Sequence, residues 1–130
     1  MVSSSQALFV YGTLMIPEVT RRVIGRMPKN RPANLGGFRR FCVAGATYPG
    51  IIPESGEQVE GLLLLDLSPV EFELLNRYEG SEYRLEVHVV YASKDKLEAS
   101  VYVYTNLSRV TAVSWAFPDD IDFGDLGLSE

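Results

Sequence analysis

Residues 7–11 (ALFVY) constrain the fold more than any other stretch, because they are almost wholly apolar and do not alternate with polar residues. Such a run is typical of a β-strand that is buried on both faces. A strand of this kind lies inside a sheet and needs packed side chains on either side. Gly12 and Thr13 end the run abruptly. The sequence therefore predicts a central strand that stops at a glycine.

The clearest helix signal follows a second apolar segment. Ser68 is placed as an N-cap, Pro69 occupies the first helical position, and Glu71 stands three residues after the cap. This spacing is that of a capping box, in which the serine and glutamate side chains satisfy each other's backbone N–H groups. We expect the helix to run to about Tyr78. Its apolar side, expected to pack on the sheet, consists of Val70, Leu74, Leu75 and Tyr78.

A shorter helix is predicted at residues 17–25, with a proline in its first turn and a glycine at its end. Residues 28–37 are rich in Pro, Asn and Gly and are expected to connect it to an extended segment at 38–46. Residues 48–58 read as a loop punctuated by two prolines and two glycines. A strand at residues 59–67 leads into the capped helix.

Residues 83–93 alternate and are predicted to form a hairpin with residues 97–104. One face of the first strand is apolar, with Leu85, Val87, Val89 and Tyr91. The other face carries Arg84, Glu86 and His88, which we expect to meet solvent. Many strands with two helices and a terminal hairpin indicate an α+β domain with a curled or barrel-like sheet.

Composition limits the classes of function. The chain has 130 residues and a formal net charge of -5, which disfavours nucleic acid and anionic membranes as partners. No apolar stretch approaches the roughly 20 residues that span a bilayer. One cysteine and one histidine exclude a Cys/His zinc site and an internal disulfide. We expect a single cytoplasmic domain over residues 1–130, with 105–130 as a less regular, acidic tail.

Two nucleophile arrangements are weakly supported by the sequence. Cys42 lies in an extended segment and His88 on the expected solvent face of the hairpin, so nothing brings them together or activates the thiol. A Ser-His-Asp triad lacks its usual setting, because no Gly-x-Ser-x-Gly motif occurs. The chemistry must therefore use other groups.

The end of the first strand, Tyr11-Gly12-Thr13-Leu14, has two readings. The glycine permits an unusual backbone conformation, and successive free N–H groups at a strand end can bind an anion or an oxyanion. A plain tight turn would use the same residues. Local spacing alone favours the turn.

Glu79 stands where the second helix ends, next to a glycine and between Tyr78 and Tyr83. A carboxyl group tucked against aromatic rings has a raised pKa and can act as a general acid or base near neutral pH. The alternative is a solvated carboxylate on the helix surface, which is the usual state of an acidic residue.

Four motifs occur together in one order: FVYGTLM at residues 9–15, YPGIIP at 48–53, VEGLLL at 59–64 and RYEGSEYR at 77–84. With these motifs the chain resembles the gamma-glutamyl cyclotransferase-like superfamily over residues 8–104, and most closely its AIG2-like branch. That branch also takes in the gamma-glutamylamine cyclotransferases. The resemblance implies a small mixed β-barrel flanked by short helices.

The resemblance also implies a chemistry. Active members cyclise a gamma-glutamyl amine or peptide to 5-oxoproline and a free amine, without metal or organic cofactor. It places the catalytic glutamate on Glu79 and the substrate cradle on Tyr11, Gly12, Thr13 and Leu14. Tyr83 and Tyr104 are candidates to line the pocket with hydroxyl groups.

Several alternatives stay open at this point. The chain could be a member of the fold that binds a small carboxylated ligand or a protein without turnover, since a fold does not secure an activity. A gamma-glutamyl hydrolase or acyltransferase would use the same pocket. Glutathione-specific relatives have serine and asparagine where this chain has Thr13 and Leu14, which argues against glutathione. Only Trp115 and residues 117–126 match the relatives' acidic, Trp-rich end. The leaving amine and the choice between monomer and homodimer are not predicted.

Overall fold

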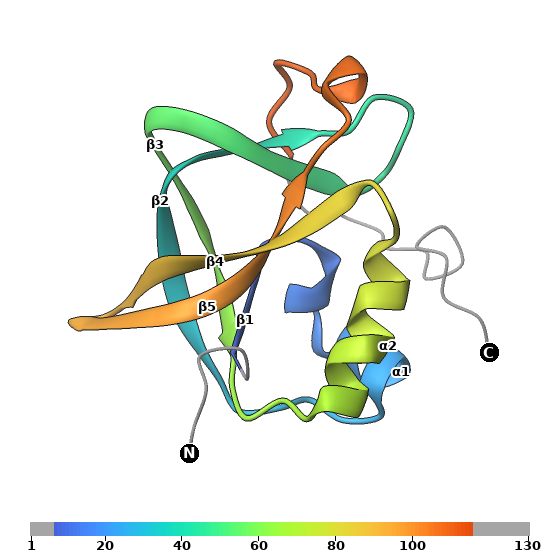
Figure 1. The fold of residues 1–130 in the computed structure, drawn as a ribbon, viewed down its shortest axis with the longest axis vertical. Helices are drawn as coiled ribbons and strands as arrows, with labels where there is room; N and C mark the ends of the chain where they lie inside the picture. The colour runs from blue at the N-terminus through green and yellow to red at the C-terminus, as the bar shows by residue number, and fades with distance from the viewer. Residues whose placement is uncertain (1–6, 116–130) are drawn as a thin grey trace.

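Five strands close into a barrel in the order β1-β3-β2-β4-β5, with two α-helices packed on one side (Figure 1). The structure is a computed structural model and describes residues 7–115. Within that range the elements are β1 Leu8–Val10, the 3-10 helix η2 Thr13–Met15, α1 Pro17–Ile24, β2 Asn30–Cys42, β3 Pro49–Leu64, α2 Pro69–Glu79, β4 Tyr83–Ala92, β5 Asp95–Tyr104 and the 3-10 helix η3 Leu107–Arg109. This is the predicted class, an α+β domain built on a small mixed barrel.

Strand β1 is central, as its apolar sequence predicts. It pairs antiparallel with β3, where Phe9 faces Leu63, and parallel with β5, where Leu8 faces Ser100. All three of its residues are buried. Phe9 packs inside the barrel, while Leu8 and Val10 pack outside it with residues of both helices. The strand is apolar at every position because it has a core on each side.

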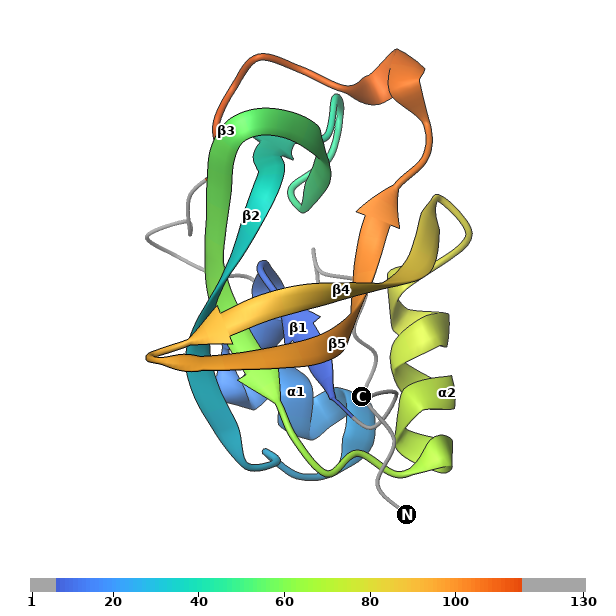
Figure 2. The same ribbon diagram turned by 60° about the vertical axis from the view of Figure 1, so that its left-hand side comes forward.

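Strands β2 and β3 form a long antiparallel pair that rises together beyond the rest of the barrel (Figure 2). The predicted connection at 28–37 and the predicted loop at 48–58 are therefore wrong, since both lie largely in these strands. The prolines that suggested a loop at 48–58 occupy positions at which a pair of β-strands accepts proline. Pro49 opens β3, and Pro53 faces Phe38 at the register shift beside Gly37. Proline is accepted at a strand start or a bulge.

Helix α2 has the predicted capping box. The Ser68 hydroxyl accepts from the Glu71 N–H at 3.1 Å, and the Glu71 carboxylate accepts from the Ser68 N–H at 2.9 Å. Leu75 is fully buried, whereas Val70 is 66% exposed and does not join the apolar side as expected. Val70 lies in the first turn of the helix, where Leu67 and Phe72 on either side of it pack against the core instead. Neither α-helix of the described range is long and apolar enough to cross a membrane.

Strands β4 and β5 pair as the predicted hairpin, with Tyr83 opposite Tyr104. The predicted faces of β4 are wrong, because its four alternating apolar residues are the exposed ones: Leu85, Val87, Val89 and Tyr91. Val90 and Ala92 instead close the barrel core. His88 is half-buried against the Phe38 ring and bonds to Glu86 at 2.8 Å. Barrel closure through β2 decides which face turns inward.

Residues 105–115 contain the short helix η3 and otherwise irregular backbone, and they run back across the ends of β2 and β3 (Figures 1 and 2). The remainder of the predicted tail, residues 116–130, lies outside the described residues.

Candidate active site

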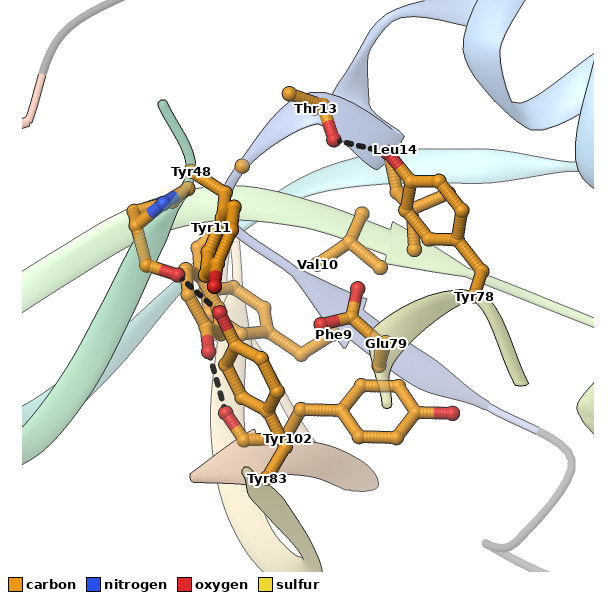
Figure 3. Close-up of a pocket in the computed structure, with 12 residues that line it drawn as sticks. Phe9, Val10, Tyr11, Thr13, Leu14, Tyr48, Tyr78, Glu79, Tyr83 and Tyr102 are labelled. Atoms are coloured by element: carbon orange, nitrogen blue, oxygen red, sulfur yellow. Dashed lines mark hydrogen bonds between the residues drawn. The ribbon is translucent and has the colours of Figure 1, made fainter. Parts of the chain in front are cut away.

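A cavity of about 180 Å³ opens where β1 ends, beside the C-terminal end of α2 (Figure 3). This is below the roughly 300–1,000 Å³ of sites for drug-sized ligands, so it suits a small group. Twelve residues line it: Phe9, Val10, Tyr11, Gly12, Thr13, Leu14, Tyr48, Pro49, Tyr78, Glu79, Tyr83 and Tyr102. The two motifs singled out in the sequence, at the strand end and at the helix end, therefore meet in one cavity.

Glu79 is the last residue of α2, and its side chain lies among the cavity's aromatic rings (Figure 3). The chain leaves the helix at Gly80, whose φ of 89° suits glycine and lets the backbone turn into β4. In residues 7–115 no hydrogen bond or ion pair reaches the Glu79 carboxylate. Burial raises the pKa of Glu79 to about 8. The carboxyl group therefore exchanges a proton near neutral pH.

Four tyrosine hydroxyls surround this carboxyl group, and each has a protein partner. Tyr11 donates to the carbonyl of Tyr102, Tyr102 to Asn76 and Tyr83 to the carbonyl of Pro49, while Tyr78 and Thr13 share a hydrogen bond of 2.8 Å. Burial, followed by the Glu79 charge, raises the pKa of Tyr11, Tyr83 and Tyr102. The phenols thus stay protonated and fix the cavity walls.

The loop from Tyr11 to Leu14 lines the cavity, and all four of its backbone carbonyls accept hydrogen bonds. Arg40 donates to the Tyr11 carbonyl at 2.7 Å and Thr20 to that of Leu14 at 2.7 Å. The carbonyls of Gly12 and Thr13 accept from the next 3-10 turn. The first hydrogen bond within η2 is donated by the Met15 N–H. The N–H groups of Gly12, Thr13 and Leu14 come before it and therefore have no helical partner. Unpaired N–H groups beside a cavity bind an anion or an oxyanion.

Arg40 adds positive charge behind this loop. Its guanidinium is half-buried and also donates to the carbonyl of Glu60 at 3.2 Å. Burial lowers the pKa of Arg40, yet an arginine remains charged at neutral pH. No cation is among the twelve lining residues. A ligand's negative group is therefore favoured at the loop amides, away from Glu79.

Gly12 is required by space. A Cβ atom at this position would lie 2.7 Å from Cγ of Pro49, closer than side chains approach. With a φ of -129° and a ψ of -135°, the backbone of Gly12 lies in neither the extended nor the helical region, which is the kind of unusual conformation that the sequence argument expects. Pro49 thereby packs directly on the loop that carries the free amides.

Most of the site residues expected from the sequence come together in the cavity. Glu79, Tyr83 and the four residues from Tyr11 to Leu14 all line it. Tyr104 does not: its ring packs on Phe41, and its hydroxyl donates to Glu82 at 2.7 Å. Tyr104 points to the same side of β5 as Tyr102, but lies one pleat repeat farther along, beyond the cavity.

Six lining residues are not among the site residues expected from the sequence: Phe9, Val10, Tyr48, Pro49, Tyr78 and Tyr102. Tyr48 was assigned to a loop without a role, although it begins the YPGIIP motif. Tyr102 lies in a strand, where alternation alone does not separate core from cavity. Tyr102 is two residues before the predicted Tyr104, so both side chains lie on the same side of β5, and this spacing could have identified Tyr102 from the sequence. No group of three His, Cys, Asp or Glu residues that could hold a metal ion occurs in residues 7–115.

Comparisons with known proteins show which family the chain is similar to. The family model described as "Gamma-glutamyl cyclotransferase, AIG2-like" matches residues 8–117. AIG2-like protein D of Arabidopsis thaliana is 34% identical over 119 residues, covering 89% of this chain and 71% of that protein. AIG2-like protein C of the same plant is 38% identical over 101 residues, covering 76% of this chain and 59% of that protein.

Solved structures share the architecture. A solution structure from Arabidopsis thaliana matches with a TM-score of 0.75 at 26% identity, covering 92% of this chain and 80% of that one. A gamma-glutamyl cyclotransferase matches with a TM-score of 0.70 at 17% identity, covering 77% and 66%. The fold is thus that of the gamma-glutamyl cyclotransferases. Within that class, the chain belongs to the gamma-glutamyl cyclotransferase, AIG2-like family.

Proposed function

We propose that this protein is a gamma-glutamyl cyclotransferase that converts a gamma-glutamyl amine or peptide to 5-oxoproline and a free amine. Glu79 is its general acid and base, and the loop from Tyr11 to Leu14 is its substrate cradle. One observation carries the proposal: within residues 7–115, a buried carboxyl group with no hydrogen bond or ion pair shares a small cavity with backbone amides that have no helical partner. Membership of the family supports it.

The reaction needs no protein nucleophile. The α-amino nitrogen of the substrate attacks its own γ-carbonyl carbon, a C–N bond closes the five-membered ring, and the bond to the leaving amine breaks. Attack within one molecule carries an advantage of effective molarity. This is consistent with a cavity lined by tyrosines and one glutamate, without cysteine, serine or histidine.

Protons account for the role of Glu79. Two protons pass from the attacking nitrogen to the leaving nitrogen, and Glu79 carries them in turn. With a pKa of about 8, the carboxyl group is poised between its two forms at neutral pH. A substrate ammonium beside it favours the ionised form, which then accepts the first proton. The phenols hold their own protons and do not compete.

The amides of Gly12, Thr13 and Leu14 serve one of two groups, the α-carboxylate of the substrate or the oxyanion of the tetrahedral intermediate. The two assignments differ in what they predict. A substrate whose α-carboxylate is converted to an amide would lose binding in the first case. In the second case it would bind with little change, because the oxyanion forms only in the transition state.

The test is direct. The purified protein is incubated with a panel of gamma-glutamyl amines and dipeptides, including γ-glutamyl-ε-lysine and glutathione, and 5-oxoproline is measured by mass spectrometry. Glu79→Gln is the matched variant, since it keeps the shape and removes the acid. We expect product from the wild type and none from Glu79→Gln. Binding of these compounds without any product would instead support a non-catalytic member of the fold.

A further inference from the structure

Residues 105–115, here called the C-terminal segment, hold the end of β2 and the loop that leads into β3. The Cys42 N–H donates to the carbonyl of Val113 at 2.8 Å, and the Thr111 hydroxyl donates to the carbonyl of Cys42 at 2.6 Å. The Ala44 N–H donates to the carbonyl of Arg109 at 2.9 Å. The segment therefore runs beside the end of β2 (Figure 2) and is hydrogen-bonded both to that end and to the loop that follows it.

The Arg109 side chain joins two elements that carry cavity walls. Its guanidinium donates to both oxygens of Glu82, at 2.9 and 3.2 Å, and to the carbonyl of Ala44, at 2.8 and 3.1 Å. Glu82 lies in the turn that follows Glu79 and precedes β4. Ala44 lies in the loop that ends at Tyr48, which lines the cavity. One planar fork thus spans both elements.

Both ends of this bridge are reinforced. The Glu82 carboxylate also accepts from Tyr104 at 2.7 Å and from Asn106 at 3.1 Å. At the loop end, the Trp115 indole N–H donates to the carbonyl of Thr47 at 3.0 Å. Thr47 directly precedes the lining residues Tyr48 and Pro49. The Glu82 carboxylate is therefore held in place to orient Arg109. The Trp115 indole contacts the loop before β3, so its fluorescence is sensitive to the position of that loop.

We propose that Arg109 is a positioning residue for the cavity, which fixes the wall formed by Tyr48 and Pro49 relative to the turn after Glu79. Arg109 is not among the lining residues, so it acts through the loop. The wall it fixes packs on Gly12 and faces the carboxyl group of Glu79 across the cavity (Figure 3). The kinetic part of this inference rests on the proposed cyclotransferase function.

The expected effect is on substrate binding more than on chemistry. Arg109→Met removes the hydrogen bonds to Glu82 and Ala44, so Tyr48 and Pro49 are no longer fixed relative to the turn after Glu79. KM should then rise about tenfold, because misplaced binding groups lose affinity for the substrate. Glu79 is held by α2 and keeps its place, so kcat should stay within about twofold. Arg109→Lys should restore part of the loss, since an ammonium can pair with Glu82 but does not reproduce the fork.

A matched control exists elsewhere in the chain. Arg26 makes a two-point pair with Glu71, at 2.6 and 2.9 Å, at the opposite end of α2 from Glu79. Arg26→Met therefore also removes an arginine–glutamate pair, at a distance of about two helical turns from the cavity. It should lower thermal stability without changing KM. A KM change in both variants, or in neither, would overturn the proposal.

Two readouts do not depend on turnover and separate this inference from the proposed function. Trp115 is the only tryptophan, so its emission should shift to the red in Arg109→Met. The Ala44 amide should exchange with deuterium at least about tenfold faster in that variant than in Arg26→Met. A wild type that makes no 5-oxoproline while both shifts occur would reject the function and keep the positioning role. Unchanged emission and exchange would reject the positioning role.

Discussion

Cγ of Pro49 lies where a side chain on Gly12 would have to begin, 2.7 Å from the position of its Cβ atom. The loop after β1 and the start of β3, which are distant in sequence, thus touch at the floor of the cavity. Gly12→Ala should push Pro49 away and weaken binding of 5-oxoproline or substrate about tenfold or more, with Gly12→Val worse, because Pro49 is a rigid ring in a strand. Isothermal titration measures this, with Gly36→Ala as control, since a Cβ at Gly36 meets nothing within 4 Å. Equal affinities would remove the loop from the site.

The raised pKa of Glu79 predicts the acidic side of the rate profile. The free enzyme must have Glu79 ionised to accept the substrate's proton, so kcat/KM should rise with pH and level off above about 8. Initial rates between pH 5 and 9, measured with a gamma-glutamyl amine, give this profile. An inflection near 4.5, the usual value for a glutamate, would contradict the buried position of the group.

The same shift predicts how stability depends on pH. Between pH 4.5 and about 8 the folded protein keeps a proton on Glu79 that the unfolded chain has released. Raising the pH through this window therefore lowers the free energy of unfolding, by about 1.4 kcal/mol per unit and at most about 5 kcal/mol from this group.

Glu79→Gln has no titratable group at this position, so comparing it with the wild type isolates the contribution of Glu79 to the pH dependence of stability. Denaturant unfolding of both proteins should show the variant gaining relative stability from pH 5 to pH 8, and a constant difference above that. A wild-type minus variant difference that does not change with pH would show that Glu79 is ordinary in the folded state.

The capping box of α2 predicts a local loss of stability. Ser68→Ala removes the acceptor of the Glu71 N–H and should lower the free energy of unfolding by about 1 kcal/mol. Ser68→Asp keeps an acceptor and should lose less. Thermal or urea unfolding compares the three proteins, and activity should be unaffected, because this cap lies at the far end of the helix from Glu79.

Local signals predicted local structure well. The apolar β1, the cap at Ser68 and the β4–β5 hairpin all depend on residues within one or two elements. Local sequence made the glutamate at the helix end only a candidate, and the resemblance to the gamma-glutamyl cyclotransferase-like superfamily is what singled it out. These features need no knowledge of the closed barrel.

Barrel closure accounts for what the sequence analysis missed. Residues 48–58 look like a loop, but pairing with β2 over a long ladder makes them a strand. The apolar face of β4 looks like the inner one, yet Val90 and Ala92 fill the barrel because of how β2 meets β4. Tyr102 and Tyr104 follow the same sequence pattern and lie on the same side of β5. Only Tyr102 lines the cavity, because the cavity does not extend as far as Tyr104. Each of these depends on partners far along the chain.

The pairing of Leu8 with Ser100 also governs when the fold can form. The first strand must wait for the last, which the ribosome adds 92 residues later. Until then the edge of β1 that pairs with β5 is unpaired, and this apolar strand can pair with other chains. Pairing of such distant segments is slow, because closing a long loop costs entropy before any contact offsets it. Assembly of the cavity therefore waits until residue 101 has been added, and a chain halted before that point would have Glu79 without a complete site around it.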